Sequence, residues 1–235
     1  MREMLIAGLF LGATAQAARA DGVIYRLPED GAQVRYELEI TTSADGQDKS
    51  GKGSLTVSSV GQATVDNQKC RWIEIKLTVN EPEEHSHVIK TLVPENDLGK
   101  GKSPLDHVVR TWIKAGNGEA TEVKDLKSPE AQALRLFLAG ASKPALEVEK
   151  VEIDSKLGKL ECAGVSGEYE VESGNGITGS VTYENRLHDK APFGLVTALW
   201  RFEGRKNGQV TESGTFKLTL ADTSTTALSK LPDKN

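Results

Sequence analysis

Alternation of apolar and polar residues with a period of two is the feature that most restricts how this chain can fold. Residues 34–40 read Val-Arg-Tyr-Glu-Leu-Glu-Ile, and from Ile73 to Val79 the apolar residues again take every second position. Successive side chains of a strand point to opposite faces of a sheet, so this pattern predicts strands with one buried and one wet face. Strands of this kind are typical of antiparallel sheets.

Turn signals separate further strands. Residues 42–53 are rich in Ser, Asp, Gly and Lys and precede an alternating run at Leu55 and Val57, which predicts a hairpin. After Pro144 the pattern returns, with turns at Gly158, 174–176 and 206–208. Strands are predicted there at residues 146–153, 159–162, 168–172, 177–183, 193–202 and 209–220. Residues 193–200 are apolar on both faces, so this strand is expected to be covered on both sides.

The middle of the chain has a different period. Ser103-Pro104 and Ser128-Pro129 each place a hydroxyl before a proline, which is typical of a helix start. Apolar residues then recur at helical spacing, at Leu105, Val108, Val109, Trp112 and Ile113 and again at Ala131, Leu134, Phe137 and Leu138. The pattern predicts two amphipathic helices, at residues 103–115 and 128–139.

These elements predict a mainly β (α+β) fold. About nine strands form one curved antiparallel sheet or half-barrel, and the two amphipathic helices pack on its concave face. A single β-rich domain is predicted at residues 21–221, because no Pro/Gly/Ser-rich linker divides it. Residues 222–235 are polar and aperiodic and are expected to be a disordered tail.

The first twenty residues carry an export signal. Arg2 precedes an apolar run from Leu5 to Ala15, and Ala18-Arg19-Ala20 resembles a cleavage site, which predicts a signal peptide at residues 1–20. Nothing later approaches eighteen consecutive apolar residues, so no membrane-spanning segment is expected after cleavage. The expected location is the periplasm, with the extracellular space as the alternative.

The charge balance argues against one class of partner. The chain has 29 Lys and Arg residues against 34 Asp and Glu, a net charge of -5, and no basic run. A nucleic-acid-binding protein is expected to carry a basic patch, so no nucleic-acid partner is predicted.

Two cysteines, Cys70 and Cys162, are present. Since an exported chain meets an oxidising compartment, a disulfide between them is predicted, and two buried free thiols are the alternative.

Motifs for catalysis or cofactors are weak. The GxGxxG string at residues 174–179 lies where strands are predicted on both sides, and residues 101–103 lack the earlier glycine of a phosphate-binding loop. The sequence Glu83-Glu84-His85-Ser86-His87 could offer metal ligands, but a third ligand, His107 or His188, would have to be brought close by the fold. No nucleophile elbow occurs. No cofactor, no metal and no catalytic residue is therefore predicted.

A short segment near the C-terminus suggests a family. Residues 190–196, Lys-Ala-Pro-Phe-Gly-Leu-Val, form a turn leading into a long apolar strand. Together with the order of elements over residues 23–221, this segment resembles the half-barrels of the LolA/LolB-like lipoprotein-carrier superfamily of bacterial envelopes. The resemblance implies an apolar cavity between sheet and helices, with a lipid or lipoprotein as possible cargo. Such carriers usually open with a helix, whereas this chain opens with Val23-Ile24-Tyr25.

Three functions remain open at this point. The first is an exported, non-catalytic carrier of a lipid or other apolar ligand, the second an envelope interaction module with a filled core, and the third a hydrolase. A carrier needs an apolar cavity, and the side chains expected to line it are Val108, Trp112, Phe137, Val196, Ala198 and Trp200.

Overall fold

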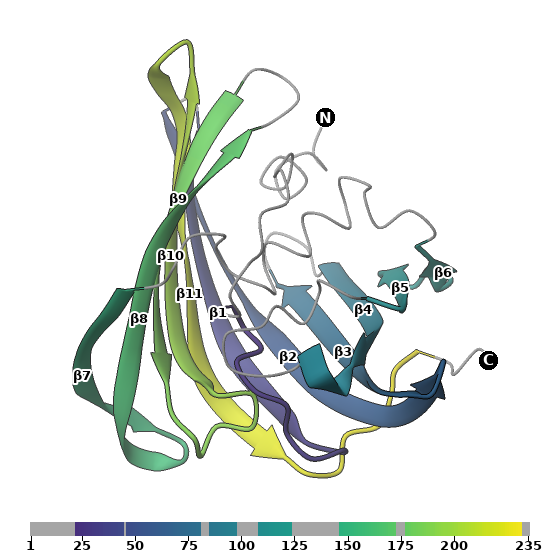
Figure 1. The fold of residues 1–235 in the computed structure, drawn as a ribbon. Helices are drawn as coiled ribbons and strands as arrows, with labels where there is room; N and C mark the ends of the chain where they lie inside the picture. The colour runs from purple at the N-terminus through teal and green to yellow at the C-terminus, as the bar shows by residue number, and fades with distance from the viewer. Residues whose placement is uncertain are drawn as a thin grey trace.

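The computed structural model describes residues 22–44, 46–80, 85–97, 108–123, 146–172 and 177–231. The predicted signal peptide and the predicted helix at residues 128–139 lie outside these ranges. All eleven described strands belong to one curved antiparallel sheet (Figure 1). The strands are β1 (Gln33–Ala44), β2 (Gln47–Val65), β3 (Gln68–Val79), β4 (His85–Pro94), β5 (Arg110–Ala115), β6 (Thr121–Glu122), β7 (Leu146–Ser155), β8 (Gly158–Glu172), β9 (Ile177–Leu187), β10 (Leu195–Lys206) and β11 (Gln209–Ser224).

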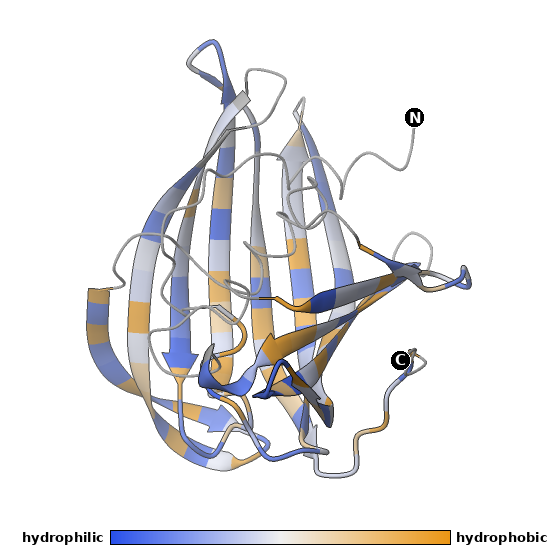
Figure 2. Ribbon diagram, turned by 45° about the vertical axis from the view of Figure 1, so that its right-hand side comes forward, coloured by the Kyte–Doolittle hydropathy of each residue, from blue (hydrophilic) through white to orange (hydrophobic). Residues whose placement is uncertain are grey.

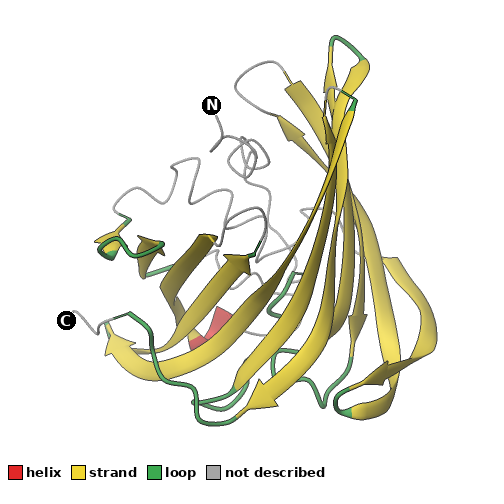
Figure 3. Ribbon diagram, turned by 180° about the vertical axis from the view of Figure 1, so that it is seen from behind, coloured by secondary structure: helices red, strands yellow, loops and turns green. Residues whose placement is uncertain are grey.

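The sheet has a simple topology. Its order is β6-β5-β4-β3-β2-β1-β11-β10-β9-β8-β7, so strands consecutive in sequence pair with each other, except that β6 and β7 lie far apart and β1 pairs with β11. Strands from the two ends of the chain therefore meet at the centre of the sheet (Figure 1), and Figure 3 shows the same sheet from behind. In the part of the chain that the structure describes, β6 and β7 form its two edges.

Tight turns connect several hairpins. Asp66 and Asn67 join β2 to β3 with φ of 50° and 62°, and Asn207 and Gly208 join β10 to β11 with φ of 51° and 79°. Two successive residues with positive φ match the turn that fits the twist of paired strands, and Asn, Asp and Gly adopt it most readily. The turn predicted at residues 206–208 is confirmed.

The period-two pattern sorts side chains onto two faces, which Figure 2 shows as alternating bands of hydropathy along the strands. We call the face that carries Val34, Tyr36 and Leu38 the inner face, and the face that carries Arg35 and Glu37 the outer face. The three inner residues are at most 2% exposed, whereas the two outer residues are exposed.

The predicted mixture of strands and helices is wrong. Among the described residues the fold is β throughout, apart from the 3-10 turn η2 (Glu95–Asp97). Residues 110–115 of the predicted helix at 103–115 form β5, which pairs with β4. Thr111, Trp112 and Ile113 are β-branched or aromatic and suit a strand, and the free edge of β4 supplies the backbone partners.

The strand count was also too low. Residues 159–162 and 168–172 belong to one strand, β8, while β4, β5 and β6 are additional strands. Phe193 and Leu195 are both fully buried. Among the described residues, the N-terminal segment around Ile24 packs against them, and no helix does. Tyr25 N–H donates to the Phe193 carbonyl at 2.9 Å.

The expected disordered tail from Asp222 also differs from the structure. β11 continues to Ser224, and residues 225–231 run along the sheet with Leu231 only 3% exposed. Main-chain N–H groups near Leu231 are held by a buried carboxylate of β3, a long-range contact that composition does not reveal.

Candidate functional site

The part of the inner face around Leu38, Leu218 and Ala198 is a sealed apolar core. Strand register places Leu38 opposite Leu218, which in turn lies opposite Ala198, and all three are at most 2% exposed. Tyr36 is buried in the same cluster, and its hydroxyl donates to the Leu195 carbonyl at 3.0 Å. Burial raises the pKa of Tyr36 well above the usual tyrosine range.

The next row of the inner face is apolar but only half-buried. Ile40 lies opposite Phe216, and Phe216 lies opposite Trp200, so the row crosses β1, β11 and β10 one step from the core. The ring of Phe202 lies 6.1 Å from that of Phe216, tilted by 44°. The row is a candidate apolar surface because its large side chains pack against the core and still remain partly exposed.

Glycines make room for two rings on this face. A Cβ on Gly214 would lie 2.4 Å from the Phe202 ring, and one on Gly167 would lie 2.5 Å from the Tyr183 hydroxyl oxygen. Real Cβ atoms do not approach other atoms so closely, so the rings rest directly over glycine backbone.

Polar groups near the row have partners. Trp200 Nε1 donates to Asn185 Oδ1 at 3.0 Å, and Asn185 itself is fully buried. Burial also raises the pKa of Tyr169, which lies opposite Val181 on the same face. The inner face therefore offers apolar contact with few ionised groups.

The structure separates the predicted lining residues. Val196 and Ala198 lie in the sealed core, Trp200 lies in the half-buried row, and Val108 packs against the core. Trp112 lies opposite Lys90 in the β4–β5 register, on the other face from Ile113. Phe137 lies outside the described residues. Sequence periodicity missed Ile40, Phe202 and Phe216, although their every-second-residue positions mark the inner face.

The predicted disulfide is not present. Cys70 on β3 and Cys162 on β8 are buried free thiols, and five strands lie between β3 and β8 in the sheet. Neighbouring strands are about 4.8 Å apart, so the sheet itself keeps the two positions apart. Burial raises the pKa of each thiol, which lowers its thiolate fraction.

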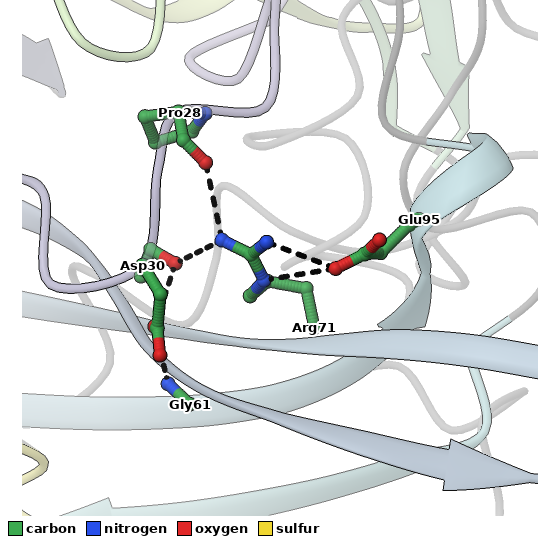
Figure 4. Close-up of polar contacts among 6 residues, drawn as sticks. Pro28, Asp30, Gly61, Arg71 and Glu95 are labelled. Carbon is green, nitrogen blue, oxygen red and sulfur yellow. Dashed lines mark hydrogen bonds and ion pairs between the residues drawn. The ribbon is translucent and has the colours of Figure 1, made fainter.

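An arginine cluster around Arg71, shown in Figure 4, was not predicted from the sequence. The Arg71 guanidinium donates to Glu95 Oε1 at 2.9 Å, to the Pro28 carbonyl at 3.1 Å and to Ser59 Oγ at 2.9 Å. Asp30 Oδ1 accepts from Gly61 N–H at 2.7 Å. Arg71 is 6% exposed and well satisfied, so the cluster is a structural tie between the N-terminal segment and β2–β3.

The possible metal ligands and the glycine-rich string can be placed only in part. Among the described residues, no group of three or more His, Cys, Asp or Glu side chains could hold a metal ion. His85 and His87 lie on β4, and Glu83 lies outside the described residues. β8 and β9 pair antiparallel, and the last three residues of the GxGxxG string, 177–179, belong to β9, so a strand follows the glycines where a dinucleotide site needs a helix.

The outer face carries a polar groove of about 700 Å³ across β1, β2, β9, β10 and β11. Its lining is mostly hydroxyl-bearing and charged side chains, namely Thr41, Thr42, Ser43, Asp48, Lys49, Ser50, Ser180, Thr182, Arg201, Phe202, Glu203, Ser213, Gly214 and Thr215. The Thr41 and Thr215 hydroxyls are 2.6 Å apart. This groove is not the apolar cavity that the sequence led us to expect.

Fold and inner face together define an open, curved antiparallel sheet with a partly exposed apolar row inside it. No protein-family model and no curated protein matches the chain. Among the described residues, no helix has the length and apolar character needed to cross a membrane.

Solved structures provide distant matches. A candidate exported protein with a YmcC-like fold from Bacteroides fragilis is 9% identical, with 85% of this chain and 98% of that chain covered and a TM-score of 0.37. A LolA superfamily protein from Nitrosomonas europaea is 10% identical, with 92% and 96% covered and a TM-score of 0.28. A candidate outer membrane lipoprotein-sorting domain from Vibrio parahaemolyticus is 9% identical, with 86% and 89% covered and a TM-score of 0.31.

A protein of the LolA superfamily, which residues 190–196 and the order of elements resemble, is thus among these matches. Likenesses at TM-scores of 0.28 to 0.37 carry no argument about function, which must come from the chain's own residues.

Proposed function

We propose that this protein is an exported, non-catalytic carrier that binds a lipid or another apolar ligand on the inner face of its sheet. The observation that carries the proposal is the half-buried row of Ile40, Phe216 and Trp200, which extends the apolar inner face beyond the sealed core. Export rests on the signal-like residues 1–20, and the periplasm is the proposed location.

Physical reasons favour an apolar ligand over a polar one. Large half-exposed side chains gain free energy when a ligand removes their remaining surface from water, at roughly 25 cal/mol per Å² of apolar area. Gly167 and Gly214 let the Tyr183 and Phe202 rings lie against the backbone of the sheet, because a Cβ at either position would meet the ring. A long apolar chain can therefore approach the aromatic rings closely.

The test is binding of N-phenyl-1-naphthylamine, a neutral apolar fluorophore, to the full chain. We expect saturable fluorescence enhancement with the wild-type protein and at least tenfold weaker binding after Phe216→Asn, because the amide places a polar group in the row. Leu199→Asn is the matched control: Leu199 is half-buried and adjoins Trp200 on β10 but faces outward, opposite Lys217.

Two results would contradict the proposal. One is a folded wild-type chain that does not bind the fluorophore. The other is equal weakening by Phe216→Asn and Leu199→Asn, which would place the bound fluorophore elsewhere. The filled-core interaction module would then be the better reading of the fold.

A further inference from the structure

The C-terminal segment at residues 225–231, which we call the strap, crosses the outer face of the sheet. It follows β11, and in Figure 1 the chain runs from the end of that strand toward β3. Ala227 N–H donates to the Gly31 carbonyl at 2.8 Å at its start, and Leu231 is buried at its end. The strap thus lies on the opposite face from the apolar row.

Two oppositely charged side chains of the sheet hold the main chain of the strap. Glu74 accepts from Lys230 N–H at 2.8 Å and from Leu231 N–H at 3.2 Å, while Lys90 Nζ donates to the Leu231 carbonyl at 3.4 Å. Glu74 and Lys90 lie opposite each other in the β3–β4 register and are 4% and 1% exposed. The pair therefore binds both the N–H and the C=O groups of a peptide backbone.

Side chains of the strap add a pattern to this backbone contact. Ala227, Ser229 and Leu231 are buried or half-buried, whereas Leu228 is 79% exposed and Lys230 is exposed. Ser229 Oγ lies 2.8 Å from Glu74 Oε2. Alternate residues of an extended peptide thus meet the sheet, and the recognised pattern is a small residue, a hydroxyl residue and a leucine at every second position.

The strap is well suited to exchange with another segment. Its hold on β3 and β4 depends on the Glu74 and Lys90 contacts and on one buried leucine. On release, Glu74 and Lys90 would face water on the outer surface instead of remaining buried without partners, so opening leaves no unpaired charge in the core. Segments held in this way belong to the low-stability end of local unfolding.

We propose that the outer face of β3 and β4 is a peptide-docking site that the strap occupies in cis. Its partner is an extended segment of another protein with the chemistry of the strap: two consecutive backbone N–H groups for Glu74, a hydroxyl residue, and a leucine two positions later. The strap competes with that segment, so the site is available to a partner only in proportion to strap release. This interaction is independent of ligand binding on the inner face.

The test uses the full chain and a fluorescent peptide that copies residues 225–231. Leu231→Asp should release the strap, because a carboxylate replaces a buried leucine, and Leu228→Asp is the matched control at an exposed neighbour. We expect the peptide to bind Leu231→Asp at least tenfold more tightly than it binds wild type or Leu228→Asp. Adding Glu74→Gln to Leu231→Asp should weaken binding at least tenfold.

Hydrogen exchange at the amides of residues 230 and 231 provides the second measurement. Faster exchange at these amides in Leu231→Asp, together with peptide binding that depends on Glu74, supports the proposal. Continued protection of the amides, failure of the released chain to bind the peptide, or binding unaffected by Glu74→Gln would each overturn it. A wild-type dimer that Glu74→Gln converts to monomers would identify a second copy as the occupant and would also overturn it.

Discussion

At the scale of single residues, the burial of Tyr36 makes the free energy of unfolding depend on pH. Its pKa is raised by burial in the folded state, so the unfolded chain loses its phenolic proton first as the pH rises above about 10. The stabilising contribution of the neutral phenol is complete below that pH and is lost progressively above it. We expect the free energy of unfolding to fall by up to about 1.4 kcal/mol per pH unit for this group.

Tyr36→Phe should separate this effect from others. Near pH 7 the variant should lose about 1–2 kcal/mol, because the Leu195 carbonyl loses its donor, and above pH 10 its stability should fall less steeply than that of wild type. Urea unfolding at a series of pH values measures both quantities. Parallel wild-type and variant curves above pH 10 would show that Tyr36 does not titrate as the structure predicts.

Arg71 is the residue on which the arginine cluster depends. Arg71→Met should destabilise the chain by roughly 2–4 kcal/mol, because Ser59 and the Pro28 carbonyl lose their donor and Glu95 loses its cation. Lys217→Met is the matched control, since it breaks an exposed ion pair with Glu39, and pairs of that kind contribute about 0–1 kcal/mol. Thermal unfolding of both variants makes the comparison, and equal effects would contradict the role of the cluster as a tie.

At the scale of elements, glycines set how β10 and β11 pack on the inner face. Gly214→Val should cost roughly 1–3 kcal/mol, because its Cβ would meet both the Phe202 ring and the Thr41 carbonyl oxygen at 2.4 Å. Ser213→Val, next to it on the outer face, should change stability by less than about 0.5 kcal/mol. Chemical denaturation distinguishes the two, and a harmless Gly214→Val would mean that both Phe202 and the β1 backbone at Thr41 have room to move.

The strands and the helices differ in how well sequence predicts them. Residues 34–40 and 73–79 alternate strictly, and both were found as strands because most of the inner-face residues in each are buried. Residues 110–115 have a helical apolar spacing and still form β5, because pairing with β4 outweighs a local preference. Local periodicity therefore predicted the strands that are buried on one face and failed where a neighbouring strand decided the outcome.

At the scale of the whole molecule, the candidate site follows from contacts between distant parts of the chain. Trp200 could be anticipated from its apolar strand, but the row that it forms with Phe216 and Ile40 requires the pairing of β1 with β11. The strap likewise depends on Glu74 and Lys90, which are more than 140 positions away from Leu231 in the sequence. Composition indicated a disordered tail there because it does not register such contacts.

The two faces of the sheet should act independently, because the sheet lies between the apolar row and the strap. Glu74→Gln should therefore accelerate hydrogen exchange at the amide of Leu231 while changing the affinity for N-phenyl-1-naphthylamine by less than about twofold. Phe216→Asn should weaken binding of the fluorophore and leave hydrogen exchange at the amide of Leu231 unchanged. The double variant should show both effects at the size they have in the single variants. A coupling free energy above about 1 kcal/mol in this cycle would mean that the strap controls the curvature of the sheet, and with it access to the inner face.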